Sequence, residues 1–411
     1  MAPKAAAEKV QKTAKLAQSF EERASGKGAP GKSAPAKLVK SKKPTAFAIM
    51  NPDGTIIKGQ TAPQIPDEDL KRLFATIVLN REIDDRMLTV QRQGRIGFYM
   101  QSRGEEASIL APAYVTTNKD WLFICYRELS SLLWRGFKLE TFCNQLYGNV
   151  HDFVKGRQMP CHYSDRDIGL VSVSSPVSTQ IPQAAGVGWA MRLKGEKNVS
   201  VCFMGEGGTS EGDFHVGLNF AAVYRANTLF ICRNNGWAIS TPASVQSASE
   251  TFAQKAEAYG MPGILVDGSD LLAMIHTSRE AVERARNGGG PTLIEALTYR
   301  FSAHSSSDDP SVYRDEKAEA EKHQDKDPLV KLRNYITKKK LWSKDWEEEL
   351  AGNAQQGIIT ALKAAEAAAL PRTETVFEDV FANQSWNLRE QQAEALKYKQ
   401  RSPHSMHGGQ S

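Results

Sequence analysis

The chain has 411 residues, 41% hydrophobic and 24% charged, which is ordinary for a globular protein and long enough for one large domain or two smaller ones. Residues 1–45 hold ten Lys and one Arg against three Glu, a balance of +8; the total is +5, so the remaining residues sum to −3. A near-neutral body argues against a broad nucleic-acid surface, and no stretch approaches the roughly 20 apolar residues of a membrane helix. We therefore expect a soluble, intracellular protein with no nucleic-acid or membrane partner.

The two ends of the chain differ from its body. Residues 1–45 are rich in Ala, Lys, Gly, Ser and Pro, which is typical of a disordered, flexible basic arm. A mitochondrial transit peptide fits less well, because such peptides avoid acidic residues and this segment carries three Glu. We therefore expect the bacterial cytoplasm, with the mitochondrial matrix as the alternative. Residues 401–411 are expected to be a frayed C-terminus.

The five cysteines form no C-x-x-C pair and are odd in number. Several lie inside apolar runs, which favours buried, reduced thiols in a reducing compartment over disulfides or a metal site.

The body, residues 46–400, alternates between helical and strand patterns. A helix is predicted from about residue 66, because Leu70, Leu73, Phe74 and Ile77 recur at helical spacing after Pro66. Short apolar strands separated by helices predict an α/β domain with a parallel sheet flanked by helices, and the charged sequence after residue 315 predicts a helical C-terminal region. The strands are predicted at 199–204, 228–233, 263–268 and 292–297, and further helices at 210–225 and 270–287.

The most informative segment is GEGGTSEGD, then a predicted helix, then TLFICRNNGW, ending at Trp237. Ligands of parallel α/β sheets bind outside the carboxyl ends of the strands, so both ends of this segment should converge on one crevice. The Glu206 carboxylate, the Asn235 amide oxygen and a backbone carbonyl of the turn are hard oxygen ligands, which suit a Mg²⁺ that also binds phosphate and water. Arg233 adds a fixed cation for the same phosphates.

Two other interpretations of the sequence, a dinucleotide-binding site and a Ser-His-Asp hydrolase, fit it less well. A dinucleotide fingerprint would have Gly or Ala at position 210 and an acidic residue ending the next strand, whereas this chain has Ser210 and Arg233. A Ser-His-Asp hydrolase built from Ser305, His304 and Asp308 fails, because such groups converge from separate segments and need an oxyanion hole.

Several long motifs carry a resemblance to a known family. They are RQGRIGFYMQSRGEEA, YRE, YGN with GRQMPCHY, SSPVSTQIPQAAG, GEGGTSEGDFHVGLNFAA, CRNNGWAISTP and HSSSDDPSVYR. With these motifs, roughly residues 50–400 resemble the α subunits of thiamine-diphosphate-dependent 2-oxo acid dehydrogenases, in particular the branched-chain type. Pyruvate or acetoin dehydrogenase α subunits are the alternative, and they usually lack SSPVSTQIP. A non-catalytic scaffold subunit is a further alternative, against which the intact metal-site residues argue.

The resemblance implies roles for individual residues. Mg²⁺ would be held by Glu206, Asn235 and the backbone carbonyl of Trp237, where the family usually has Tyr. Thiamine diphosphate would be held by Tyr126, Arg127, Val177, Gly207, Gly208, Arg233 and His304, of which His304 and Tyr126 are also the expected catalytic residues. K⁺ would be held by Ser174, Pro176, Thr179 and Gln180. The substrate side chain would face Phe98, Cys125 and Val177; the family often has Gln at position 125 and Leu at 177.

The resemblance also implies a shared activity. The chain would decarboxylate branched-chain 2-oxo acids such as 2-oxoisovalerate together with a β subunit, as two α and two β chains, and pass the acyl group to the lipoyl arm of an acyltransferase component. The activating Glu of this family is on the β chain.

Gly186 and Gly188, in the small-residue run 183–190, are compatible with a close interface or with internal helix packing. Ser305 matches a phosphorylation target of mitochondrial relatives, but Asp315 stands at the second target, so inherited phospho-control is left open.

Overall fold

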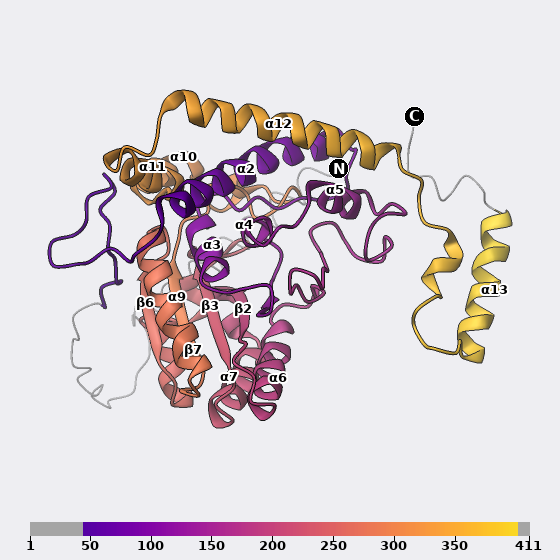
Figure 1. The fold of residues 1–411 in the computed structure, drawn as a ribbon. Coiled ribbons are helices and arrows are strands. Elements are labelled where there is room, and N and C mark those ends of the chain that lie inside the picture. Colours follow the sequence, from indigo (N-terminus) through magenta and orange to yellow (C-terminus); the bar gives the residue numbers. More distant parts are fainter. Residues whose placement is uncertain (1–43, 402–411) are drawn as a thin grey trace, which may run out of the picture. The chain divides into compact units, whose positions relative to one another are not determined.

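The computed structural model describes residues 44–401, shown as a ribbon in Figure 1. The predictions of a basic N-terminal arm and a frayed C-terminus fall almost wholly outside these residues. Within the described part of the chain, no helix is long and apolar enough to cross a membrane.

A five-stranded parallel sheet forms the centre of the body, as the sequence predicts (Figure 1). Each predicted strand is present to within a residue or two. A short first strand, which precedes Cys125, was not predicted. The order across the sheet is β1-β2-β3-β7-β6, and every neighbouring pair is parallel. The strands are β1 (Trp121–Phe123), β2 (Ser200–Gly205), β3 (Thr228–Asn234), β6 (Gly263–Asp267) and β7 (Thr292–Leu297).

The two faces of the sheet pack against different helices. Successive side chains of a strand point to opposite faces, and the two hydrophobic clusters divide accordingly. Phe203 and Ile231 belong to the cluster that includes buried residues of helices α2 (Asp67–Arg92), α3 (Glu106–Tyr114) and α9 (Leu271–Arg286). Met204 and Phe230 belong to the cluster that includes buried residues of α6 (Gln180–Leu193) and α7 (Gly212–Val223). Both faces are therefore covered, which explains why the strands are continuously apolar rather than alternating.

The helices that cover the sheet begin and end close to the predicted positions. In α2 (Asp67–Arg92) the predicted apolar stripe is buried, with Leu73, Phe74 and Ile77 fully inaccessible. The predicted helix at 210–225 is α7 (Gly212–Val223), preceded by the 3-10 turn η1 (Glu206–Ser210). The other α-helices of the sheet region are α3 (Glu106–Tyr114), α4 (Leu129–Trp134), α5 (Leu139–Tyr147), α6 (Gln180–Leu193), α8 (Ala243–Gln246) and α9 (Leu271–Arg286).

After residue 315 the described chain is mostly helical, as predicted. The partly buried Asp327 side chain caps helix α11 (Pro328–Lys338) and also pairs with Arg81 of α2, which fixes this region to the body. The remaining elements are the antiparallel pair β4 (Trp237–Ala238) and β5 (Thr241–Pro242), the 3-10 turns η2 (Ala253–Tyr259), η3 (Pro310–Val312), η4 (Gln324–Lys326) and η5 (Thr373–Val376), and helices α10 (Glu316–Lys322), α11 (Pro328–Lys338), α12 (Lys344–Ala367) and α13 (Trp386–Arg401).

Candidate functional site

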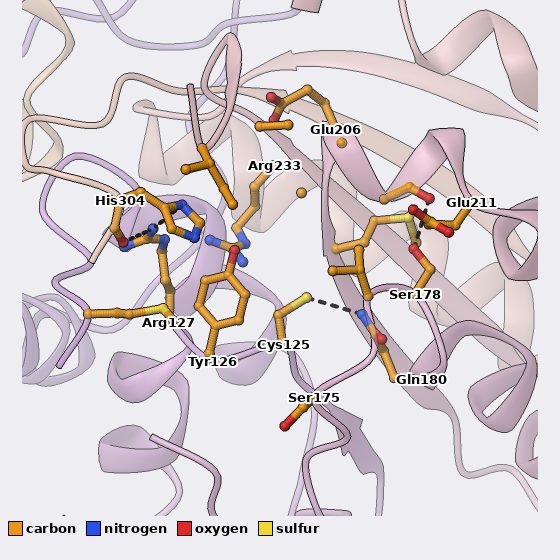
Figure 2. A pocket seen from close by; sticks show the side chains of 18 of the residues that line it. Cys125, Tyr126, Arg127, Ser175, Ser178, Gln180, Glu206, Glu211, Arg233 and His304 are labelled. Atoms are coloured by element: carbon orange, nitrogen blue, oxygen red, sulfur yellow. Dashed lines mark hydrogen bonds between the residues drawn. The ribbon is translucent and has the colours of Figure 1, made fainter. Parts of the chain in front are cut away.

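A cavity of about 420 Å³ lies at the carboxyl edge of the sheet. Its walls come from segments that follow four parallel strands: 125–127 after β1, 205–208 after β2, Asn235 and 237–239 after β3, and His304 after β7. The loop 174–178 before α6 supplies a further wall. Figure 2 shows Tyr126, Arg127 and His304 on one side of this cavity and Ser178, Gln180 and Glu211 on the other. The convergence expected from the parallel topology is present.

Glu206 is a buried carboxylate with an unsatisfied oxygen. The residue is 1% exposed, and its Oε1 atom has no hydrogen-bond partner among the described residues. Burial, together with the nearby negative charge of Glu105, raises the pKa of Glu206 to about 7. A buried, unpaired carboxylate oxygen is costly unless a cation or a proton neutralises it. Glu206 is therefore suited to bind a cation.

The two consecutive asparagines at the end of β3 face different partners. Asn235 Nδ2 donates to Glu105 Oε1 at 2.8 Å, and Asn235 Oδ1 accepts from the Trp237 N–H at 3.1 Å. Asn234 Nδ2 donates instead to Glu295 Oε1 at 2.8 Å, and Asn234 does not line the cavity. Asn235 therefore contributes to the site, whereas Asn234 stabilises the strand end.

Arg233 is held between two buried carboxylates, Glu105 and Glu128. All three side chains are at most 3% exposed. Burial opposes ionisation of Glu105, but the charges of Arg233 and Arg127 hold its pKa below the usual value. Glu128 Oε2 also accepts the N–H groups of Cys125 and Tyr126, at 3.0 and 2.9 Å. Arg233, expected to be a fixed cation for phosphates, is thus also paired with two carboxylates that anchor the cavity walls.

His304 is held in one neutral tautomer. Arg127 Nη2 lies 3.1 Å from His304 Nδ1, and Arg300 Nη1 lies 3.4 Å from the same atom. A guanidinium group only donates, so Nδ1 accepts and the ring proton is on Nε2. Burial and the two arginines lower the pKa of His304 to about 3. The edge-on ring of Tyr126, with its centroid at 5.8 Å, completes this side of the cavity.

The opposite wall brings two backbones into close contact. Ser178, in the left-handed region at φ 74°, donates from its hydroxyl to the Gly208 carbonyl at 2.8 Å. A Cβ at Gly208 would lie 2.7 Å from Ser178 Oγ, and one at Gly207 would lie 2.6 Å from the Ala238 Cβ. Only glycine fits these positions without a shift of the neighbours. Gln180 Nε2 donates to the Phe203 carbonyl at 2.9 Å and to Cys125 Sγ at 3.1 Å.

Comparison with known proteins decides the family. The family described as "Dehydrogenase E1 component" matches residues 75–374. The mitochondrial 2-oxoisovalerate dehydrogenase subunit alpha of Dictyostelium discoideum is 40% identical, over 86% of this chain and 80% of that protein. The mitochondrial 2-oxoisovalerate dehydrogenase subunit alpha 1 of Arabidopsis thaliana is 41% identical, over 86% of this chain and 75% of that protein. The corresponding subunit alpha of Homo sapiens is 38% identical, over 86% of this chain and 80% of that protein. The chain belongs to the dehydrogenase E1 component family. This membership argues against the dinucleotide interpretation.

The cavity gathers most of the residues that the family resemblance singles out. Phe98 and Thr179 are the exceptions, since neither lines it. The predicted residues that line the cavity are Cys125, Tyr126, Arg127, Ser174, Pro176, Val177, Gln180, Glu206, Gly207, Gly208, Arg233, Asn235, Trp237 and His304.

The alternatives for the small-residue run and the cysteines can also be compared with the structure. A Cβ at Gly188 would lie 2.2 Å from Thr228 Oγ1, so this glycine serves packing within the chain, whereas Gly186 has open space around it. All five cysteines are free, and only Cys125 is not fully buried, as expected for reduced thiols.

Four charged residues of the site were not predicted: Glu105, Glu128, Glu211 and Arg300. Glu105 and Glu128 stand inside the motifs GEEA and YRE, which were used only as marks of resemblance. Arg300 is 1% exposed and donates from Nη2 to the Tyr313 hydroxyl at 2.9 Å. Tyr313 in turn donates to Asp308 at 2.7 Å, so Arg300 ties the 304–313 loop to the site.

Proposed function

We propose that this chain is the α subunit of a branched-chain 2-oxo acid dehydrogenase that binds thiamine diphosphate and Mg²⁺ in the cavity at the sheet edge. The observation that carries the proposal is the buried, unpartnered Oε1 atom of Glu206, which lines a cavity also lined by Asn235 and by the close-packed glycines 207 and 208. Membership of the E1 component family and relatives named 2-oxoisovalerate dehydrogenase subunit alpha support the same conclusion.

The metal would be held by Glu206, Asn235 and the backbone carbonyl of Trp237. Among the residues that the structure describes, no three His, Cys, Asp or Glu side chains form a metal cluster. One carboxylate and neutral oxygens fit a cation whose remaining ligands are phosphate oxygens and water, which is the usual condition of Mg²⁺.

The diphosphate would lie against the glycines and the basic wall. Gly207 and Gly208 allow close approach of the backbone. Arg127 and Arg233 supply positive charge, and the Nε2–H of His304 and the hydroxyl of Tyr126 are donors on the same side. Val177, 60% exposed, would support the ring system of the cofactor from the loop before α6. When bound, thiamine diphosphate supplies the carbon nucleophile and the electron sink for decarboxylation.

The chain's own residues would act on the reaction by orientation and proton placement. His304 is neutral and donates from Nε2, so it would stabilise negative charge on an oxygen in the cavity without itself carrying charge. Tyr126 would assist from the same side of the cavity, next to His304. Phe98, Cys125 and Val177 would contact the branched substrate side chain; Cys125 and Val177 line the cavity, whereas Phe98 does not.

A K⁺ site would stiffen the loop beside the cofactor. Ser174, Pro176, Thr179 and Gln180 would supply hydroxyl, carbonyl and amide oxygens. Because Gln180 Nε2 is committed to the Phe203 carbonyl, its Oε1 atom is the end available to a cation.

The site would be completed by a β subunit. The three carboxylates that line the cavity are Glu105, Glu206 and Glu211. Glu105 is paired with Arg233, and Glu206 is assigned to the metal, so the carboxylate that activates the cofactor would come from the β chain, in an assembly of two α and two β chains. The acyl product would pass to the lipoyl arm of an acyltransferase partner. Turnover by the isolated chain would contradict this assignment and would make Glu211 the candidate.

The relatives named above carry the word mitochondrial in their names. They favour the mitochondrial matrix for this chain, and none of them supports the bacterial cytoplasm that its N-terminal composition suggested.

The test is a coupled assay of the chain with its β partner across 2-oxo acids. Turnover of 2-oxoisovalerate at least tenfold more efficient than that of pyruvate supports the proposal. A preference for pyruvate would instead indicate the pyruvate dehydrogenase alternative, and no turnover with any 2-oxo acid would refute both.

A further inference from the structure

Glu105 lies at the junction of the cationic and the metal-binding parts of the cavity. It is 1% exposed and immediately precedes α3, on an element separate from both strands that end at the site. One carboxylate oxygen receives Arg233, and the other receives Asn235 Nδ2 at 2.8 Å. No other described carboxylate hydrogen-bonds the side chain of Asn235.

We propose that Glu105 is a positioning residue that fixes the orientation of the Asn235 amide and thereby aims its oxygen at the metal. This inference rests on the proposed function, in which Asn235 Oδ1 is a Mg²⁺ ligand.

The argument follows from what each group can donate. An ionised carboxylate only accepts hydrogen bonds, whereas an Asn side chain has a donating nitrogen end and an accepting oxygen end. The end that faces Glu105 must therefore be the nitrogen, and Oδ1 is turned away from it. There Oδ1 accepts the Trp237 N–H at 3.1 Å and retains a second lone pair for a cation. If the amide were flipped, Nδ2 would face both the metal and the Trp237 N–H, and neither of these can accept a hydrogen bond.

Glu128 provides a matched comparison. It is equally buried and pairs with the same Arg233, but it binds the N–H groups of Cys125 and Tyr126 rather than Asn235. Losing the charge of either glutamate leaves Arg233 with one carboxylate. Only the loss of Glu105 removes the constraint on the metal-binding amide.

The test is calorimetric titration of thiamine diphosphate into the assembled α and β chains over a range of Mg²⁺ concentrations. Removing a side chain that hydrogen-bonds a metal ligand typically lowers metal affinity by about 10–100-fold. We expect Glu105→Gln to raise the Mg²⁺ concentration for half-maximal binding at least about tenfold, with cofactor affinity at saturating Mg²⁺ within about threefold of wild type. Glu128→Gln should show the opposite pattern: weaker cofactor binding at every Mg²⁺ concentration.

A double variant separates amide orientation from a general loss of structure. In the double variant Glu105→Gln with Asn235→Asp, the amide at position 105 can donate to the carboxylate at position 235. That carboxylate presents one oxygen to position 105 and the other to the metal. We expect this exchange to recover most of the Mg²⁺ affinity lost by Glu105→Gln alone, which a merely structural role would not do.

Three results would overturn the proposal. They are a wild-type Mg²⁺ requirement in Glu105→Gln, equal Mg²⁺ shifts in Glu105→Gln and Glu128→Gln, or no recovery in the double variant. If Glu105→Gln fails to assemble, Glu105→Asp, which keeps the charge but shortens the reach, replaces it with the same expected shift, and an unshifted requirement contradicts the inference. Failure of the wild-type assembly to bind the cofactor would refute the proposed function itself.

Discussion

Arg127 donates from Nη2 to His304 Nδ1 at 3.1 Å, and this contact leaves the imidazole proton on Nε2. The same guanidinium also donates to the His304 carbonyl, so both the position and the tautomer of the ring depend on one side chain. Because Arg300 adds a second positive charge near Nδ1, protonation of the ring is opposed from two directions.

This arrangement predicts a pH-dependent stability. The pKa of His304 is lowered to about 3 in the folded chain, against 6.5 in the absence of these contacts. The unfolded chain therefore binds one more proton between these pH values, so stability falls as the pH drops below 6.5. Gln can accept from Arg127 and donate into the cavity but does not titrate. We expect wild type to lose thermal stability relative to His304→Gln between pH 7.5 and pH 5; parallel curves would contradict the assignment.

Asp84 should contribute in the opposite direction. It is 2% exposed and accepts from the Tyr99 hydroxyl at 2.7 Å and the Ser102 N–H at 2.9 Å, and burial raises its pKa to about 7. Because the folded state binds this proton more tightly than the unfolded state, Asp84 stabilises the fold fully below pH 3.8. This stabilisation is lost as the pH rises through about 7. Asp84→Asn keeps an acceptor but cannot ionise. The free energy of unfolding of Asp84→Asn, measured with denaturant, should therefore rise relative to wild type from pH 5 to pH 8. The rise is about 1.4 kcal/mol for each pH unit up to the folded pKa of about 7. A constant difference would show that Asp84 does not titrate in this range.

Two glycines of α6 form a matched pair for packing. A methyl group at Gly188 would meet Thr228 Oγ1 at 2.2 Å and the Asn227 carbonyl at 2.9 Å, whereas one at Gly186 meets nothing within 4 Å. We expect Gly188→Ala to lower the free energy of unfolding of the isolated chain by about 1–3 kcal/mol, because overpacking moves the strand and the helix apart. Gly186→Ala should stabilise it by about 0.5–1 kcal/mol through helix propensity. If Gly186→Ala leaves the isolated chain stable but weakens assembly with the β chain, this face of α6 is the interface that the small-residue run first suggested.

Trp237 should tolerate replacement by the usual family residue. Its proposed metal contact is through the backbone carbonyl, and its ring packs on Tyr313 at 5.3 Å between centroids. We expect Trp237→Tyr to bind thiamine diphosphate with an affinity within about threefold of wild type, measured by calorimetry. A loss comparable to that caused by removing a metal ligand would mean that the indole ring has a role of its own.

Most of the sheet could be predicted from sequence because its strands are buried on both faces and therefore read as short apolar runs, such as VSVCFM. The strand β1 was missed because three residues carry too little periodicity to separate them from a loop. The order of the strands was also beyond prediction, since it depends on pairing between segments far apart in the chain.

The site could be predicted where residues follow a strand directly, as Glu206 and Asn235 do. Glu105 could not, because it joins Arg233 over a separation of 128 residues, and no local pattern distinguishes it from its neighbour Glu106, which pairs with Arg81 instead. The same limit applies to Arg233, whose place at the end of a strand follows from the sequence but whose two carboxylate partners do not.

The central claim is that Glu206 binds a divalent cation that holds the diphosphate of the cofactor. The most direct test is calorimetric titration of thiamine diphosphate into the assembled α and β chains, with Mg²⁺ or with EDTA, for wild type and Glu206→Ala. We predict binding by wild type with Mg²⁺, at least about 100-fold weaker binding with EDTA, and no Mg²⁺-dependent binding by a folded Glu206→Ala variant. Equal affinity of wild type and Glu206→Ala in the presence of Mg²⁺ would contradict the account.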